Sequence, residues 1–451
     1  MIVTILFGII GLGLMVFVHE LGHFAAAKSC GIAVEVFSLG WGPRLVGFTR
    51  GGTSYQISWF PLGGYCKLKG EEYYKQGKEG DEARSSDSFF AASPLRRILV
   101  AASGPIASLV LALFILTGVH WAGFTIRSPD SRIVLATDYA LDSFPTTPPA
   151  TAAGLKTGDR VLAIDGTSVE KFQDLLEKVS SAAGKTMIFS VSRAGTVLDL
   201  SVTARLDKES GAGKIGVYAW IDPVVETVAQ GTAASLAGIL PADRIVKIGG
   251  KGVGNSMDLN QALQSRPPKL DVELERGGRK VETTLVLAYN EAGEPNIGLS
   301  FKQPSWRSPR LGPFGAAWKS VQDAGTTIVQ TVQGFGLLFS GINLRNAVAG
   351  PLRITYYIGS AASNGFQFGI GQGLTAFLRL LSFLSIVLFL MNLLPIPALD
   401  GGQILLFLIE IVRKKPVQTE VIGRIQFAGF SVLILLSLAV TASDVLYFIG
   451  R

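Results

Sequence analysis

The run His19-Glu20-Leu21-Gly22-His23 places two imidazoles and a carboxylate at a spacing that suits metal chemistry. Residues four apart share one face of a helix, so His19 and His23 can both reach one ion. Glu20 then lies beside that ion, where it can act as general base on a bound water. The run lies within or at the end of an apolar stretch, where such side chains are costly unless they serve a purpose. We therefore interpret it as a zinc site and not as a polar helix end.

A catalytic zinc ion usually takes three protein ligands, so a third donor must come from elsewhere in the chain. Asp400 follows an apolar stretch in the segment 392–402, where two prolines stop helix propagation and irregular backbone indicates a lined cavity. His120, at the far end of another apolar stretch, is better explained as an interfacial residue. Glu410 and Asp444 lack the broken-helix context, and Asp444 is expected to lie at a solvated helix end. We choose Asp400.

Four apolar stretches must position these residues, and each is close to the ~20 residues that cross a bilayer as a helix. They cover residues 2–18, 98–119, 374–394 and 425–448. We predict four transmembrane helices, with the first retained because no basic residue precedes Lys28 and no cleavage site is evident. The run 404–412 is too short to cross, so we expect an interfacial or buried helix there.

Basic residues gather in the connections 28–97 and 413–424, which predicts that both are cytoplasmic and that 120–373 faces the other side. The net charge of +7 is concentrated beside the apolar stretches. Anionic lipid explains this charge, and we expect no nucleic-acid partner. Cys30 and Cys66 both fall in the first connection, so no structural disulfide is expected.

The middle of the chain contains an internal repeat, because residues 153–166 align without gaps to residues 237–250. Each copy has a turn carrying Asp159 or Asp243, then an apolar strand, a Gly turn, a helical pattern and a strand-rich stretch. The pattern resembles the circularly permuted PDZ domain of bacterial proteases, more closely in the first copy, since Ala242 replaces a usual glycine in the second. Such modules capture extended chains by strand addition; alternatively, these two are spacers that bind nothing.

Taken together, the HELGH run, the N-x-L-P-x-P-x-L-D-G segment and the inserted repeats resemble the site-2 protease family of intramembrane metalloproteases. The resemblance covers nearly the whole chain. It implies Zn²⁺ bound by His19, His23 and Asp400, catalysis by Glu20, and a substrate-supporting role for Asn392. Family members often carry G-P-x-x-N in the second span, whereas this chain has Ser108 at the Asn position.

An intramembrane protease must replace the hydrogen bonds of a helix that it unwinds. Residues 53–60 alternate like a strand, and a turn containing Gly63 and Gly64 precedes the stretch 65–69. The edge of this hairpin could receive an unwound substrate as an added strand, so we assign Gly63, Gly64 and Asn392 to substrate binding. The alternatives are an ordinary cytoplasmic hairpin and an amide that satisfies carbonyls at a helix end.

The sequence thus predicts a polytopic α-helical membrane protein with two inserted α+β PDZ-like domains. A weakly amphipathic stretch at 326–344 is expected on the outer membrane surface. The predicted segments are 1–27 (first helix), 28–97 (hairpin region), 98–122 (second helix), 123–208 and 209–300 (PDZ-like domains), 301–373 (surface linker), 374–402 (third helix), 403–424 (short helix and loop) and 425–451 (fourth helix).

The resemblance further implies a bacterial inner-membrane enzyme in contact with lipid, whose site faces the cytoplasm and whose PDZ-like domains face outward. Its expected partners are transmembrane substrates, namely an anti-sigma factor already trimmed by another protease and leftover signal peptides. The PDZ-like domains would gate or bind these substrates. A noncatalytic scaffold would not need Glu20 and a complete ligand set. An ion transporter would need polar residues inside the other apolar stretches, which are sparse there.

Overall fold

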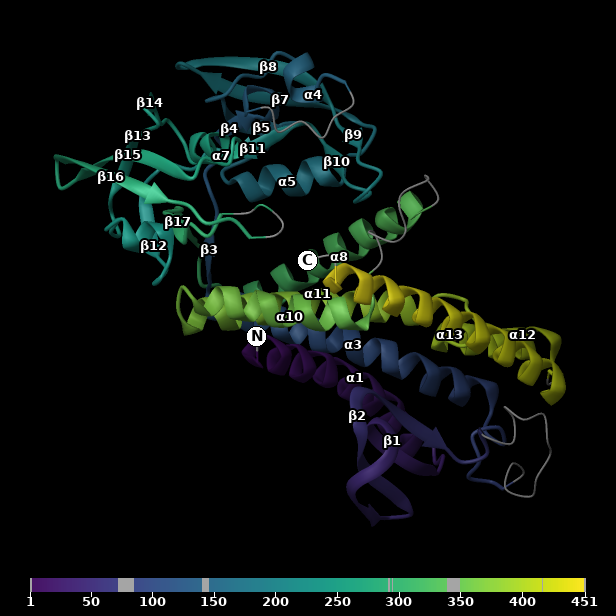
Figure 1. Cartoon of the computed structure of the whole chain (residues 1–451). Helices are drawn as coiled ribbons and strands as arrows, with labels where there is room; N and C mark the ends of the chain where they lie inside the picture. The colour runs from purple at the N-terminus through teal and green to yellow at the C-terminus, as the bar shows by residue number, and fades with distance from the viewer. Residues whose placement is uncertain are drawn as a thin grey trace. The chain divides into compact units, whose positions relative to one another are not determined.

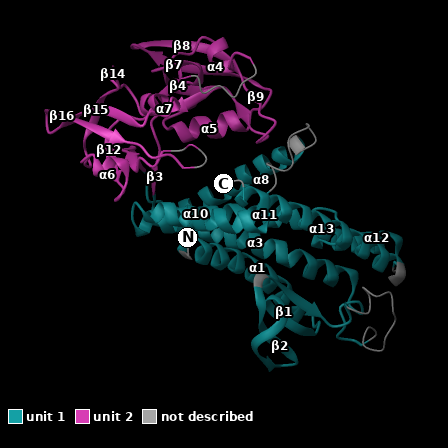
Figure 2. Ribbon diagram, viewed as in Figure 1, with its two compact units in different colours: residues 1–124, 307–336, 344–451 teal, residues 125–306, 337–343 magenta. Residues whose placement is uncertain are grey.

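The structure, a computed structural model, describes residues 2–71, 85–139, 146–290, 293, 295–338, 349–415 and 417–449 (Figure 1). The chain forms two compact units, distinguished by colour in Figure 2. A helical unit contains residues 1–124, 307–336 and 344–451, and a strand-rich unit contains residues 125–306 and 337–343. The strand-rich unit is therefore inserted into the helical one.

Among the described residues, four helices of the helical unit are long and apolar enough to cross a membrane, in agreement with the predicted number of spans. They are α1 (Ile2–Ser29), α3 (Pro94–Ala122), α11 (Ile370–Asn392) and α13 (Thr419–Ile449). The first continues beyond the apolar stretch and carries the whole HELGH run. The second begins with Pro94, whose fixed φ and missing N–H suit a first helical turn.

A broken segment separates α11 from the 14-residue helix α12 (Asp400–Arg413). The third predicted segment, 374–402, ends as a helix at Asn392, because Pro395 and Pro397 cannot continue it. Asp400 is the first residue of α12, which also contains the short helix expected at 404–412. The first turn of α12 packs tightly, since a side chain at Gly401 would strike the carbonyl of Leu393.

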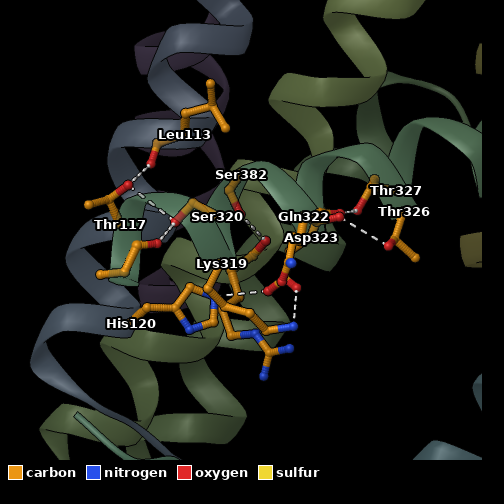
Figure 3. A network of polar contacts seen from close by, with 12 residues as sticks. Leu113, Thr117, His120, Lys319, Ser320, Gln322, Asp323, Thr326, Thr327 and Ser382 are labelled. Carbon is orange, nitrogen blue, oxygen red and sulfur yellow. Dashed lines mark hydrogen bonds and ion pairs between the residues drawn. The ribbon is translucent and has the colours of Figure 1, made fainter. Parts of the chain in front are cut away.

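Two further helices, α8 (Pro313–Leu338) and α10 (Pro351–Phe366), occupy the predicted surface linker. α10 packs against α1 and α11 and buries Ile358 and Ala362. Figure 3 shows α8 beside α3, with His120 Nε2 at 2.8 Å from Asp323 Oδ2. The end of the stretch predicted at 326–344 lies outside the described residues.

The expected solvated position of Asp444 is wrong. The side chain is fully buried, and its Oδ1 lies 2.5 Å from Nε of Arg353 on α10. Backbone N–H groups of Gly350 and Arg353 also donate to this carboxylate. A carboxylate near the end of an apolar helix therefore joins two helices here. His120 is buried within the protein and pairs with Asp323 on α8, and its place at the membrane–water interface stays a prediction.

A small sheet of two long strands, β1 (Val34–Arg50) and β2 (Thr53–Leu68), covers one end of α1. The predicted pieces 53–60 and 65–69 belong to the single strand β2. Val36 pairs with both Ser54 and Lys67, so residues 36–39 of β1 lie between two parts of β2. Among the described strands, residues 64–68 of β2 pair with β1 alone and form an edge.

The strand-rich unit contains the same arrangement twice. One four-stranded sheet has the order β6-β5-β7-β8 and the other the order β14-β13-β15-β16, and each includes one copy of the sequence repeat. The first sheet consists of β5 (Arg160–Ile164), β6 (Thr167–Ser168), β7 (Thr186–Arg193) and β8 (Thr196–Thr203). The second consists of β13 (Arg244–Ile248), β14 (Lys251–Gly252), β15 (Lys269–Arg276) and β16 (Arg279–Val286).

Short elements complete the two halves, each of which has its own apolar core. In the first half, β4 (Ile133–Leu135) pairs with β11 (Val217–Ala219) and β9 (Arg205–Leu206) with β10 (Gly213–Lys214). In the second, β12 (Val225–Val228) pairs with β17 (Leu299–Phe301). Pairing of β3 (Thr125–Arg127) with β18 (Ser305–Arg307) closes the base of the unit. The helices are η2 (Ala136–Tyr139), α4 (Pro149–Ala152), α5 (Phe172–Ser180), α6 (Ala233–Leu236) and α7 (Met257–Gln264).

The repeated aspartates have the same structural role in both halves. Arg193 contacts both oxygens of Asp159, and Arg276 contacts both oxygens of Asp243 at 2.7 and 2.6 Å. Both carboxylates are 1% exposed, and each arginine also donates to a carbonyl in the preceding turn. The Arg276 guanidinium holds the pKa of Asp243 below its usual range. The pairs therefore attach each turn to its sheet.

We predict that Asp243→Asn lowers the free energy of unfolding of this half by roughly 2–4 kcal/mol, because Arg276 loses a bidentate ion pair. Hydrogen exchange of the β13 and β15 amides in the full-length chain measures the change. Lys247→Ala, which removes the exposed pair with Glu273, is the control and should cost less than about 1 kcal/mol.

The same substitution has a pH signature. Because folding lowers the pKa of Asp243, its stabilisation is present above the unfolded pKa of about 3.9 and is lost as pH falls through the folded value. The difference between wild type and Asp243→Asn should therefore shrink in acid. A difference that stays constant down to about pH 2 would contradict the assigned cause.

Candidate metal centre

Two helices bring three potential ligand atoms together in the helical unit. α1 carries His19 and His23 one turn apart, and α12 begins with Asp400. The two Nε2 atoms are 3.3 Å apart, and Oδ2 of Asp400 lies 3.3 Å from that of His19 and 3.5 Å from that of His23. Among the described residues, this is the one group of three or more His, Cys, Asp or Glu side chains that could hold a metal ion.

α3 orients both imidazoles through contacts to their Nδ1 atoms, on the side of each ring away from the ligand cluster. His23 Nδ1 lies 2.8 Å from the carbonyl oxygen of Val100, which can only accept, so Nδ1 carries the hydrogen. His19 Nδ1 lies 3.1 Å from Ser108 Oγ, whose own hydroxyl donates to the carbonyl of Gly104. The Ser108 oxygen is then the acceptor, and His19 also carries its hydrogen on Nδ1. Neutral histidines bonded in this way present Nε2 lone pairs to the centre of the group.

The ligand atoms of the group fit a zinc ion. Two imidazole lone pairs and a carboxylate oxygen face one another, and among the described residues no buried hydrogen-bond donor reaches Asp400 Oδ2. Three such acceptors repel one another unless a cation lies between them. Ligand atoms at 2.0–2.1 Å from zinc and at tetrahedral angles lie roughly 3.3 Å apart, close to the separations of the group.

Small residues let α1 and α3 approach closely at this point. A side chain at Gly22 would strike the carbonyl of Ser103, and one at Gly104 would strike the His23 ring. Sequence reasoning noted the departure at Ser108 but missed Val100 and Gly104. Their spacing contains the signal, because residues 100, 104 and 108 are four apart and share one helix face.

Glu20 and Asn392 line the same cavity of about 600 Å³ as the three potential ligands. Residues 65–68, on the edge of β2, also line this cavity. Asn392 donates to the carbonyl of Leu388 at 3.1 Å, as the helix-end alternative expected, while still facing the cavity.

The two glycines assigned to substrate binding lie at the rim of this arrangement. Gly64 is close to α1, since an added Cβ would lie 3.4 Å from Cγ of Glu20 and 2.9 Å from the carbonyl oxygen of Ser38. Gly63 adopts φ +113°, which favours glycine, and packs against the indole of Trp41. Neither Gly63 nor Gly64 lines the cavity itself, whereas Trp41 does.

The chain is similar to known metalloproteases along most of its length. The sequence profile of peptidase family M50 matches residues 7–436. A protein of Treponema pallidum (strain Nichols), named as a zinc metalloprotease, is 33% identical over 447 residues, which cover 98% of this chain and 99% of that protein. Regulator of sigma-E protease RseP of Escherichia coli (strain K12) is 30% identical over 449 residues, or 95% of each chain. Protease RseP of Yersinia pestis is 29% identical over 435 residues, or 92% of each chain.

Proposed function

The chain belongs to peptidase family M50 and is a zinc-dependent protease of the site-2 type, and we propose that it cuts peptide bonds within transmembrane segments of single-pass membrane proteins. The observation that carries this proposal is that the Nε2 atoms of His19 and His23 and a carboxylate oxygen of Asp400 converge. They do so beside the Glu20 carboxylate, in a chain whose described residues include four helices able to cross a membrane. Such an arrangement inside a membrane protein indicates hydrolysis at membrane depth.

The proposed zinc ligands are His19, His23 and Asp400, with Val100 and Ser108 fixing the two rings from behind. Zinc, when bound, acidifies water and polarises a carbonyl group as a Lewis acid. Outer contacts of this kind hold ligand rings at the correct angle, and their loss typically lowers metal affinity about 10–100-fold. Ser108, at the position where family members often carry asparagine, is the residue that orients the His19 ring in this chain.

Glu20 is the proposed general base. It takes a proton from the water that attacks the scissile carbonyl and gives a proton to the leaving amide nitrogen. It lies next to the β2 edge, since a Cβ added at Gly64 would come within 3.4 Å of its Cγ. The base and the proposed substrate-binding edge therefore line one cavity.

Residues 64–68 of β2 are the proposed binding edge for an unwound substrate. A helix that crosses a membrane satisfies its own backbone, so unwinding it requires replacement partners, which a strand edge supplies. Gly64 keeps this edge close to α1, and Gly63 packs against the indole of Trp41, so a larger residue would not fit at either position. Asn392, across the cavity, would support the substrate backbone on its other side.

The two halves of the strand-rich unit are proposed PDZ-like domains that gate substrates by size. The sequence placed their bounds at 123–208 and 209–300, whereas β10 and β11 pair with strands of the first half, so the proposed first domain extends to Ala219. Their repeated sheets and helices support this assignment. We place the protein in a bacterial inner membrane with the metal centre toward the cytoplasm and these domains outside. Its proposed substrate is an anti-sigma factor already trimmed by another protease, together with leftover signal peptides.

Substitution of the base tests its role. Glu20→Gln preserves shape and size, so it should bind zinc normally and lose at least ~10²-fold in the rate of cleavage of a single-pass substrate. Rate and zinc content are measured on the same purified sample. Near-normal cleavage would remove Glu20 from the mechanism.

The third ligand has a matched control in the chain. Asp400→Ala should lose most zinc affinity, whereas His120→Ala should retain it, because His120 pairs with Asp323 on α8. Zinc is titrated in competition with a chromophoric chelator. Loss of zinc from His120→Ala but not from Asp400→Ala would show that the ligand set is wrong.

Deletion of the strand-rich unit tests gating. Paired strands lie about 5 Å apart, so a short Gly/Ser linker between β3 and β18 can replace residues 128–304. The variant should keep zinc, cut short substrates and newly cut untrimmed ones. Slower cleavage of trimmed substrates would instead identify recruitment, and an unchanged length preference would reject gating.

A further inference from the structure

The C-terminal end of α12, opposite Asp400, is held to α3 by a buried ion pair. Arg97 Nη2 on α3 lies 2.5 Å from Oε2 of Glu410 on α12. Both side chains are buried, at 5% and 3% exposure. The other oxygen of Glu410 accepts the backbone N–H of Val417, and the guanidinium lies 4.6 Å from the ring centroid of Phe407. The pair therefore joins α3, α12 and the residues that follow α12.

Stability alone does not account for this pair. Removing two charges from water costs several kcal/mol per ion, and well-packed apolar residues often serve equally well in such places. An ion pair specifies geometry in a way that apolar contacts do not, because both partners must meet at hydrogen-bonding distance.

One face of α3 contacts both histidines of the metal centre and the helix that carries Asp400. Arg97, Val100, Gly104 and Ser108 follow one another at three- and four-residue spacing and so lie on one face. Val100 and Gly104 contact His23, Ser108 contacts His19, and Arg97 holds α12, which begins with Asp400. The histidines are thus oriented directly by α3, whereas Asp400 is connected to α3 through its helix.

Asp400 depends on that helix for its position. Among the described residues, no hydrogen-bond donor holds its buried Oδ2. Ten residues separate it from Glu410, or about 15 Å of helix, so a rotation or slide of α12 at one end moves the other. We propose that Arg97 and Glu410 are positioning residues that fix α12 on α3 so that Asp400 meets the two histidines. This inference rests on the proposed metal centre.

The test uses full-length protein in detergent and measures zinc affinity by chelator competition. Glu410→Gln retains the shape of the side chain and an acceptor for Val417 but removes the charge. The double variant Arg97→Met/Glu410→Met replaces both charges with apolar side chains of similar length, which should preserve the fold. We expect both variants to bind zinc roughly 10–100-fold more weakly, as for other residues that orient ligands.

Two further measurements separate positioning from general stabilisation. The melting temperature of the zinc-free double variant should stay near that of the zinc-free wild type. The d–d absorption of the cobalt-substituted double variant should change, because the ligand geometry has changed. Asp444→Asn is the matched control, since it breaks an equally buried pair, with Arg353, that does not involve α12. It should leave zinc affinity unchanged.

Wild-type zinc affinity and an unchanged cobalt spectrum in the double variant would overturn the proposal. An equal loss of zinc affinity in Asp444→Asn would also overturn it, because the effect would then be general loosening. The proposed function fails separately: if Asp400→Ala keeps wild-type affinity, Asp400 is not a ligand. If Asp400→Ala loses zinc while the double variant does not, the ligand set stands and the positioning role fails.

Discussion

Mutual repulsion between three lone-pair donors is the constraint on which this structure depends. His19, His23 and Asp400 face one another at 3.3–3.5 Å, and the hydrogens that could have linked the two rings point instead toward Val100 and Ser108. Such a cluster persists only if the surrounding helices hold it and a cation neutralises it. The close approach of α1 to α3, the broken segment before α12 and the tightly packed first turn of α12 all serve to hold it.

Much of this arrangement is readable from local sequence. The HELGH spacing fixes two side chains on one helix face whatever the rest of the chain does. Apolar length predicts the four spans, and two prolines predict the break before Asp400. The internal repeat predicts that the middle of the chain contains one arrangement twice, and the two sheets have the same strand order. These features depend on residues that are close in sequence.

The remaining features depend on pairings between distant residues, which a single sequence does not encode locally. Asp444 reads as a polar helix end, and only the presence of Arg353 on α10 makes it a buried partner. The packing of α10 on α1 depends on glycines in α1 that look like ordinary small residues. The double pairing of β1 also escapes prediction, because alternation indicates a strand but not the number of its neighbours.

The closed base of the strand-rich unit has a consequence for assembly of the helices. β3 pairs with β18. Just beyond them, the backbone N–H of Ser308 donates to the carbonyl of Phe124, and that of Leu311 donates to the carbonyl of His120. An unfolded insertion would make α3 and α8 the ends of a loop of nearly two hundred residues. Once the insertion has folded, that loop is only a few residues long. Each halving of a flexible loop lowers the entropic cost of closure by about 0.6 kcal/mol, so roughly five halvings return about 3 kcal/mol. Folding of the insertion thus brings the end of α3 next to the start of α8, so that the later helices dock across a short loop instead of a long one.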